Sequence, residues 1–126
     1  MNELLRIDSI MYKVTDLEKS AKFWQQNLGM RVAWRDIEAK MIGLVFRSSK
    51  DSEIVLHTDN SIPNYDFSFI VKNVDNFVEE YKNKGLEVKI EPTDVRCGRY
   101  AVLLDLDDNL IPIIDLTKFN NKPRYN

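Results

Sequence analysis

The chain contains the same pattern twice: the end of a strand, a helix start, an amphipathic helix and a glycine stop. In the first copy, Thr15 and Glu18 have the spacing of a capping box, which satisfies backbone N–H groups that the first helical turn leaves unpaired. The apolar residues that follow share one helical face; they are Leu17, Ala21, Trp24 and Leu28. Gly29 then ends the predicted helix, because glycine adopts the left-handed conformation without a Cβ clash.

The second copy of the pattern begins at Val71 and ends at Gly85. Apolar residues 57 positions apart correspond, and the pairs are Val14 and Val71, Leu17 and Val74, Ala21 and Val78, and Trp24 and Tyr81. The two glycines are 56 positions apart, so the match includes one residue of slip. A constant offset over several apolar positions predicts a duplicated module of about sixty residues. Trp24 and Tyr81 are then expected in the core.

The length and composition favour a single domain made of these two modules. We expect a first module over residues 1–60, a second over 61–116, and a polar tail over 117–126 within one domain of 126 residues. With 18 basic and 20 acidic residues the net charge is −2, which argues against a nucleic-acid partner. No apolar run approaches the length of a membrane span. Cys97 is the only cysteine, so no internal disulfide forms and a cytoplasmic location is expected.

The strands expected around the two helices complete the modules. In the first module they cover 5–14, 30–36, 41–47 and 53–58, and in the second 66–71, 86–90, 99–104 and 110–116, with Pro92 in a loop. Turns are expected at 48–52 and in the linker 60–64, and the tail is expected to be mobile or to pack across a partner. Alternation along the first strand turns Ser9 and Met11 away from the helix. The sequence thus predicts an α+β fold: two βαβββ modules forming a curved, mixed eight-stranded sheet with a ligand cleft.

Two segments of the chain carry a family resemblance: residues 7–24 followed by Leu28-Gly29-Met30, and residues 98–102 with 105–111. They resemble the glyoxalase / bleomycin-resistance / extradiol-dioxygenase superfamily, also called vicinal oxygen chelate proteins. The second segment is similar to the family's closing pattern G-R…D-P-D-G-N. The resemblance covers nearly the whole chain. It implies the two-module fold, a small-molecule ligand and a homodimer, with modules that either stay in one chain or are exchanged between two.

The resemblance also indicates where metal-dependent members of the family carry their ligands. Carried over position by position, those ligands fall on Ser9, Val55, Asp66 and Pro112. The repeat relates these positions in pairs, because 9 and 66, like 55 and 112, are 57 apart. Valine and proline offer no side-chain donor and serine is a poor one, whereas a transition metal needs about three or four strong donors. We therefore expect neither a metal nor a cofactor.

The expected ligand-binding residues are those that face away from the helices. They are Ser9, Met11, Trp34, Val55, His57, Asp66, Ile70 and Pro112. Asp66 is also the candidate general base, because burial in an apolar site raises the pKa of a carboxyl group; the alternative is a hydrogen-bonded residue at a strand start. His57 is either a donor beside Asp66 or a rim histidine, and Trp34 either stacks on a ligand or packs between strands. Cys97 lacks a nearby base in the sequence, which argues against a nucleophile.

Three functions remain open from the residues and the resemblance. The first is a metal-free protein of the bleomycin-resistance type that binds a small molecule in the cleft. The second is a glyoxalase-like lyase or isomerase, or a dioxygenase, acting with a metal or with Asp66 as the general base. The third is an interaction module whose working surface is a sheet edge or the tail. Whether the chain is an enzyme is therefore not decided by the sequence.

Overall fold

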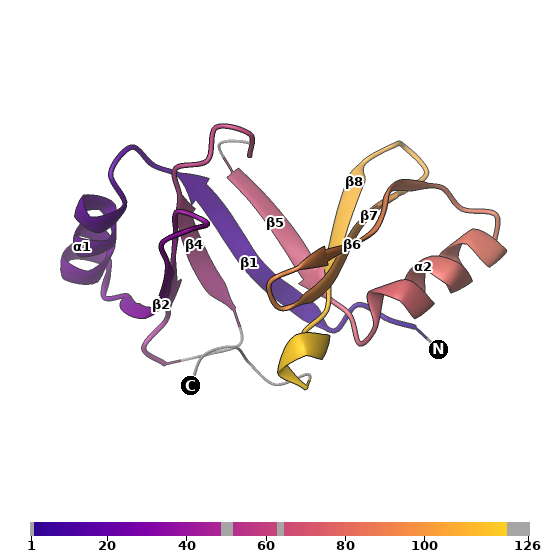
Figure 1. Cartoon of the computed structure of the whole chain (residues 1–126), viewed down its shortest axis with the longest axis horizontal. Helices are drawn as coiled ribbons and strands as arrows, with labels where there is room; N and C mark the ends of the chain where they lie inside the picture. The colour runs from indigo at the N-terminus through magenta and orange to yellow at the C-terminus, as the bar shows by residue number, and fades with distance from the viewer. Residues whose placement is uncertain (1, 49–51, 63–64, 121–126) are drawn as a thin grey trace. The chain divides into compact units, whose positions relative to one another are not determined.

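The computed structural model describes residues 2–48, 52–62 and 65–120. In chain order the elements are β1 Arg6–Lys13, α1 Leu17–Leu28, β2 Arg31–Asp36, β3 Met41–Val45, β4 Glu53–His57, β5 Tyr65–Ile70, α2 Val74–Asn83, β6 Val88–Val95, β7 Gly98–Leu104, β8 Leu110–Ile114 and the 3₁₀ helix η1 Thr117–Phe119 (Figure 1). The order βαβββ occurs twice, so the predicted α+β class is confirmed. Parts of the predicted turn, linker and tail, residues 49–51, 63–64 and 121–126, lie outside the described residues.

The chain forms two compact units. The α1 unit comprises Asp8–Phe67, and the α2 unit joins the residues up to Ile7 to those from Ser68 onward. Each unit contains one of the two long helices and has its own apolar core. Among the described residues, none of the helices has both the length and the hydropathy needed to cross a bilayer.

In the α1 unit the strands lie in the order β2-β3-β4-β1, with β1 parallel to β4 and the other neighbours antiparallel. α1 covers one face of this sheet, and the core between them consists of Ala21, Met30, Ile42, Leu44, Ile54 and Leu56. The helix ends as predicted, at Gly29 with φ 70. The predicted cap at Thr15 is wrong by one residue. Asp16 is the extended residue before the helix, and its carboxylate accepts the N–H of Lys19 at 3.0 Å.

In the α2 unit the order is β5-β8-β7-β6, with β5 parallel to β8. α2 lies alongside β6 and β7, and it packs over a core of Val71, Val74, Val78, Ala101, Leu103 and Ile113 (Figure 1). The prediction of a loop at Pro92 is wrong, because this residue lies within β6. β6 is an edge strand, and its register shifts between Ile90 and Thr93, so a residue without an N–H is tolerated there.

The opposite face of the α2 unit has a smaller core that includes part of the predicted tail. Ile70, Cys97 and Leu116 are buried together, and Phe119 of η1 packs against them. Thr117–Phe119, at the start of the predicted tail, therefore fold with this unit. Cys97 is buried in this cluster, where it packs as a small apolar side chain.

One fully buried carboxylate joins three segments of the α2 unit. Asp115 is 0% exposed, and its Oδ2 accepts the N–H of Val74 at the start of α2 at 2.8 Å. Its Oδ1 accepts the N–H of Arg99 at 2.9 Å and the hydroxyl of Thr117 at 2.7 Å. A Cβ on Gly98 would come within 2.1 Å of the same oxygen, so only glycine fits beside it. Asp115 thus fixes the start of α2 against β7 and the turn after β8.

Replacing Asp115 with Ala should destabilise the protein strongly, because several buried N–H groups would lose their acceptor at once. We expect the free energy of unfolding to fall by about 3 kcal/mol, the range for buried polar groups left unpaired. Urea unfolding followed by circular dichroism measures this change. The control is Asp107→Ala at an exposed residue of the β7–β8 turn, and similar losses in both variants would contradict the role of Asp115.

The turn between β7 and β8 is organised by Asp105. Its Oδ1 accepts the N–H groups of Asp107 and Asn109, both at 2.8 Å, and its Oδ2 accepts the side-chain amide of Asn109 at 3.0 Å. The hydrogen bond from the Asn109 side chain, followed by the two backbone N–H groups, holds the pKa of Asp105 below its ordinary value. Asp108 in this turn adopts φ 62, in the left-handed region that Asp enters more often than most residues with a side chain.

The lowered pKa of Asp105 predicts a pH-dependent contribution to stability. The unfolded chain binds this proton more readily, so the contribution is complete above the unfolded pKa of about 3.9 and disappears as the pH falls through the lower folded pKa. Asp105→Asn should therefore be less stable than the wild type at neutral pH, and the difference should shrink in acid. Urea unfolding at a series of pH values measures it, with Asp107→Asn as the control. A difference independent of pH would contradict the assignment.

Candidate functional site

The candidate site is the face of the α1-unit sheet that points away from α1. Ile54 and Leu56 face the helix, so alternation along β4 turns Glu53, Val55 and His57 to the other side. The register continues this face across the neighbouring strands, because Ser9 pairs with Glu53, Met11 and Gly43 pair with Val55, and Trp34 pairs with Gly43. Ser9, Glu53, Val55 and His57 are all buried. We call this set, with Met11, Trp34 and Gly43, the Trp34 face.

A tryptophan and a carboxylate form the centre of the Trp34 face. The indole N–H of Trp34 donates to Oε2 of Glu53 at 3.0 Å, and Glu53 is 1% exposed. A Cβ on Gly43 would lie 2.1 Å from two atoms of the indole ring, so the ring rests directly on the glycine backbone. The absence of a side chain at Gly43 therefore allows Trp34 to cross β3 and reach β4. The indole thus contacts β3 and β4 in the structure, and stacking on a ligand stays a prediction.

His57 lies at the other end of β4 on the same face. It is 0% exposed, and its Nδ1 accepts the backbone N–H of Asp59 at 3.1 Å. The neutral imidazole therefore carries its proton on Nε2. Asp59 is in turn held by Ser61, whose hydroxyl and N–H lower the pKa of that carboxyl group. The imidazole is fixed by the turn after β4, so its orientation is set by local backbone geometry.

The predicted site residues divide between the two units. Ser9, Met11, Trp34, Val55 and His57 share the Trp34 face. Asp66 belongs to the same unit, where its carboxylate accepts the N–H of Phe67 at 2.9 Å at the start of β5. Ile70 and Pro112 belong to the α2 unit: Ile70 is in the core with Cys97, and Pro112 is buried opposite Val102.

The sequence prediction omitted Glu53, the most deeply buried carboxylate of the α1 unit. The signal was present, because Glu53, Val55 and His57 alternate along one strand and so share a face. The burial of Glu53 is explained by the hydrogen bond from Trp34, which provides a partner for the carboxylate inside the fold.

The donors of the site do not fit a catalytic metal ion. Val55 provides no donor, and the carboxylates of Asp66 and Glu53 accept N–H groups from Phe67 and Trp34. Within residues 2–48, 52–62 and 65–120, no three His, Cys, Asp or Glu side chains are grouped closely enough to hold a metal. A catalytic zinc site uses about three protein ligands. The side chains of this site therefore do not form a catalytic zinc site.

Comparison with known proteins establishes the family. The profile of the Glyoxalase/Bleomycin resistance protein/Dioxygenase superfamily matches residues 6–113, so the chain belongs to this superfamily. No curated protein sequence matches the chain. The residues that carried the resemblance lie in both modules, and the superfamily assignment made from them is confirmed.

Solved structures share the fold at low sequence identity. A methylmalonyl-CoA epimerase variant from Streptomyces coelicolor, in complex with 2-nitronate-propionyl-CoA, is 20% identical with a TM-score of 0.61, covering 90% of this chain and 98% of the other. Methylmalonyl-CoA epimerase from Mycobacterium tuberculosis is 16% identical with a TM-score of 0.64, covering 89% and 88%. A structure described as NAD-dependent benzaldehyde dehydrogenase from Legionella pneumophila is 19% identical with a TM-score of 0.62, covering 86% and 97%. At these identities the likeness concerns the fold.

Gly43→Ala tests the contact at the centre of the Trp34 face. The added methyl group would force the indole off β3, so we expect a loss of about 1–3 kcal/mol in the free energy of unfolding, as for an overpacked site. The matched background is Trp34→Ala, in which the same glycine substitution should cost much less because the indole is gone. Denaturant unfolding of the four proteins measures the coupling. Equal costs of Gly43→Ala in both backgrounds would show that the indole does not rest on this glycine.

Proposed function

We propose that the protein binds a small organic molecule at the Trp34 face without a metal ion. The observation that carries the proposal is the buried Glu53 carboxylate held by the indole N–H of Trp34. A buried carboxylate favours a ligand with a cationic or N–H group, because such a donor compensates its desolvation. Val55 and Met11 next to it offer apolar contact. The ligand class is thus a small, mainly apolar molecule with a basic group.

The side chain of Trp34 is central to the proposed binding. Because the indole crosses Gly43 and touches Glu53, a ligand that reaches this carboxylate competes with the indole N–H for it. The displaced ring then provides a flat surface on which an aromatic or cationic group stacks. Binding should therefore change the environment of Trp34. This expectation separates the Trp34 face from any other binding surface of the chain.

The assembly and location of the protein are part of the proposal. Superfamily membership supports a homodimer, and a single buried cysteine fits a reducing cytoplasm. Both statements have direct tests: the mass of the purified protein by light scattering, and fractionation of cells. The partner in this proposal is a small molecule, and the net charge of −2 gives no support for nucleic acid.

A proton-transfer enzyme is the second candidate, favoured by the same buried carboxylate. Epimerisation next to a carbonyl requires a base that removes a proton and an acid that returns one. Glu53 is the acidic residue of the Trp34 face. The other titratable group there is His57, whose neutral imidazole carries its proton on Nε2. The fold is shared with methylmalonyl-CoA epimerases, which supports an isomerase-type reaction. Asp66 remains the alternative base, at the start of β5.

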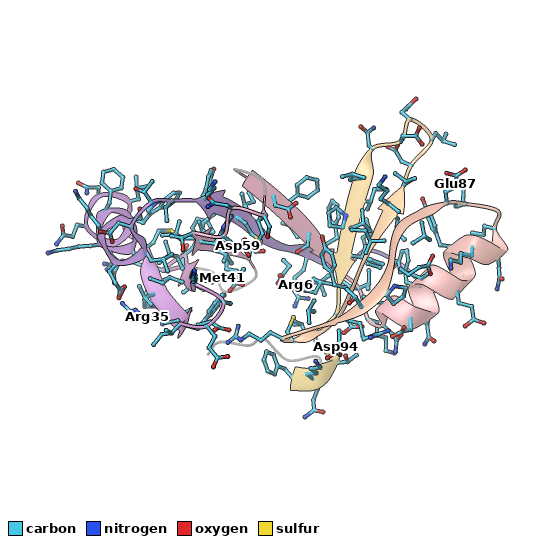
Figure 2. The ribbon with its side chains drawn as sticks, turned by 45° about the horizontal axis from the view of Figure 1, so that its top comes forward. Arg6, Arg35, Met41, Asp59, Glu87 and Asp94 are labelled. Atoms are coloured by element: carbon cyan, nitrogen blue, oxygen red, sulfur yellow. The ribbon has the colours of Figure 1, made fainter. Side chains whose placement is uncertain are left out.

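Thermal-shift screening of the dialysed full chain tests the binding proposal. We expect basic, mainly apolar compounds to raise the melting temperature and to change tryptophan fluorescence. Glu53→Gln keeps an acceptor for the Trp34 N–H but removes the charge, so affinity for these compounds should fall by about tenfold, the loss of a charge-assisted hydrogen bond. The control is Glu87→Gln at an exposed glutamate of the α2 unit (Figure 2). Equal affinity in wild type and Glu53→Gln would contradict the assignment of the site.

Deuterium exchange separates binding from proton transfer. If Glu53 is a base, the protein should exchange the acidic proton of methylmalonyl-CoA with D₂O, as detected by NMR, and Glu53→Gln should lose this activity while keeping its fold. Asp66→Asn should retain the activity in that case, and lose it if Asp66 is the base. Absence of exchange in the wild type would exclude this reaction for that substrate and leave the binding proposal to the thermal-shift screen.

A further inference from the structure

A separate pocket lies within the α2 unit, at the carboxyl end of β5. It has a volume of about 120 Å³ and is lined by Leu5, Arg6, Ile70, Val71, Lys72 and Leu116. Two backbone hydrogen bonds fix its walls: Leu5 N–H donates to Ile70 O at 2.8 Å, and Val71 N–H donates to Ile114 O at 2.9 Å. Ile70 and Leu116 belong to a buried core cluster, so this part of the lining is also held in place. The pocket is thus preformed.

The charged groups that line the pocket are both positive. Arg6 is partly buried and Lys72 is exposed, and no acidic side chain is among the lining residues. The ion pairs formed by the described residues involve neither of these two cations. Asp115 lies next to Leu116 in the chain, but its oxygens already accept hydrogen bonds from Val74, Arg99 and Thr117. The two cations therefore favour an external anion.

We propose that this pocket binds a small organic carboxylate. The rest of its lining is apolar, so the ligand needs an apolar group as well as a negative charge. An apolar cavity of about 150 Å³ holds a benzene ring, so the somewhat smaller space here suits a short or branched acyl chain. The guanidinium of Arg6 matches the two oxygens of a carboxylate, and Lys72 adds a point charge. The acyl chain lies against Ile70 and Leu116.

The proposed carboxylate site is independent of the proposed function. Its residues belong to the α2 unit, whereas the Trp34 face belongs to the α1 unit. The two sites also have opposite chemistry, because the Trp34 face offers a buried carboxylate and the pocket offers two cations. Failure of one proposal therefore leaves the other intact, and substitutions at Arg6 and Lys72 leave the Trp34 face unchanged.

NMR of the ¹⁵N-labelled full chain tests the pocket. Titration with isobutyrate should shift the backbone amides of Leu5, Ile70, Val71, Lys72 and Leu116 saturably in the millimolar range. The neutral isostere isobutyramide and inorganic phosphate should each bind at least about tenfold more weakly, because the first lacks the charge and the second lacks the apolar group. Equal shifts with isobutyramide would show that charge plays no part. Equal shifts with phosphate would show only electrostatic attraction, and either result would overturn the proposal.

Substitution of the two cations provides the second arm of the experiment. The double variant Arg6→Gln with Lys72→Gln should lose about tenfold or more in isobutyrate affinity. Lys84→Gln, at an exposed lysine near the end of α2, is the matched control and should bind like the wild type. If the double variant is not folded, the single variant Lys72→Gln tests the proposal instead. Lys72 is exposed, and its replacement should still weaken isobutyrate binding several-fold. Unchanged affinity, or no saturable shift in the wild type, would overturn the proposal.

Discussion

The constraint on which the rest of this structure depends is that, in each unit, one face of the strands is buried under the helix of that unit. In the α1 unit Ile54 and Leu56 face α1, and in the α2 unit Ala101 and Leu103 face α2. Burial of an Ile or Leu side chain is worth about 1.5–3 kcal/mol, more than a typical ion pair at the surface. Because these alternate positions along each strand are buried in the cores, the positions between them lie on the opposite face of the strands. The helices thereby decide which side chains are available for a ligand.

Two of the buried carboxylates, Asp115 and Glu53, have different kinds of partner. Asp115 bonds to backbone N–H groups and to the hydroxyl of Thr117, two residues away, so its partners are fixed parts of the fold. Glu53 bonds to the indole of Trp34, a side chain that can change rotamer without unfolding a strand. The contacts of Asp115 therefore stabilise the fold, and the contact between Glu53 and a side chain supports the proposed role of Glu53 in ligand binding.

Much of the fold followed from the sequence because it depends on periodicity. The helices, their glycine stops and the strand alternation were all predicted from patterns that local sterics and burial enforce. The sequence predictions were wrong where one side chain, or the position of a strand at the sheet edge, determines the local structure. Asp16 caps α1 in place of Thr15, and Pro92 lies in β6 because an edge strand tolerates it. Glu53 was missed because a hydrogen bond between residues 19 positions apart determines its burial.

Within the described residues, the positions that correspond to the Trp34 face in the second half of the chain carry different side chains. The positions 57 residues after Glu53 and His57 are Leu110 and Ile114, so the second module has apolar residues in place of the titratable pair. The residue 57 positions after Gly43 is Tyr100, which cannot provide the bare backbone on which the indole of Trp34 rests. The α1 unit therefore has a buried carboxylate at a place where the α2 unit has only apolar side chains.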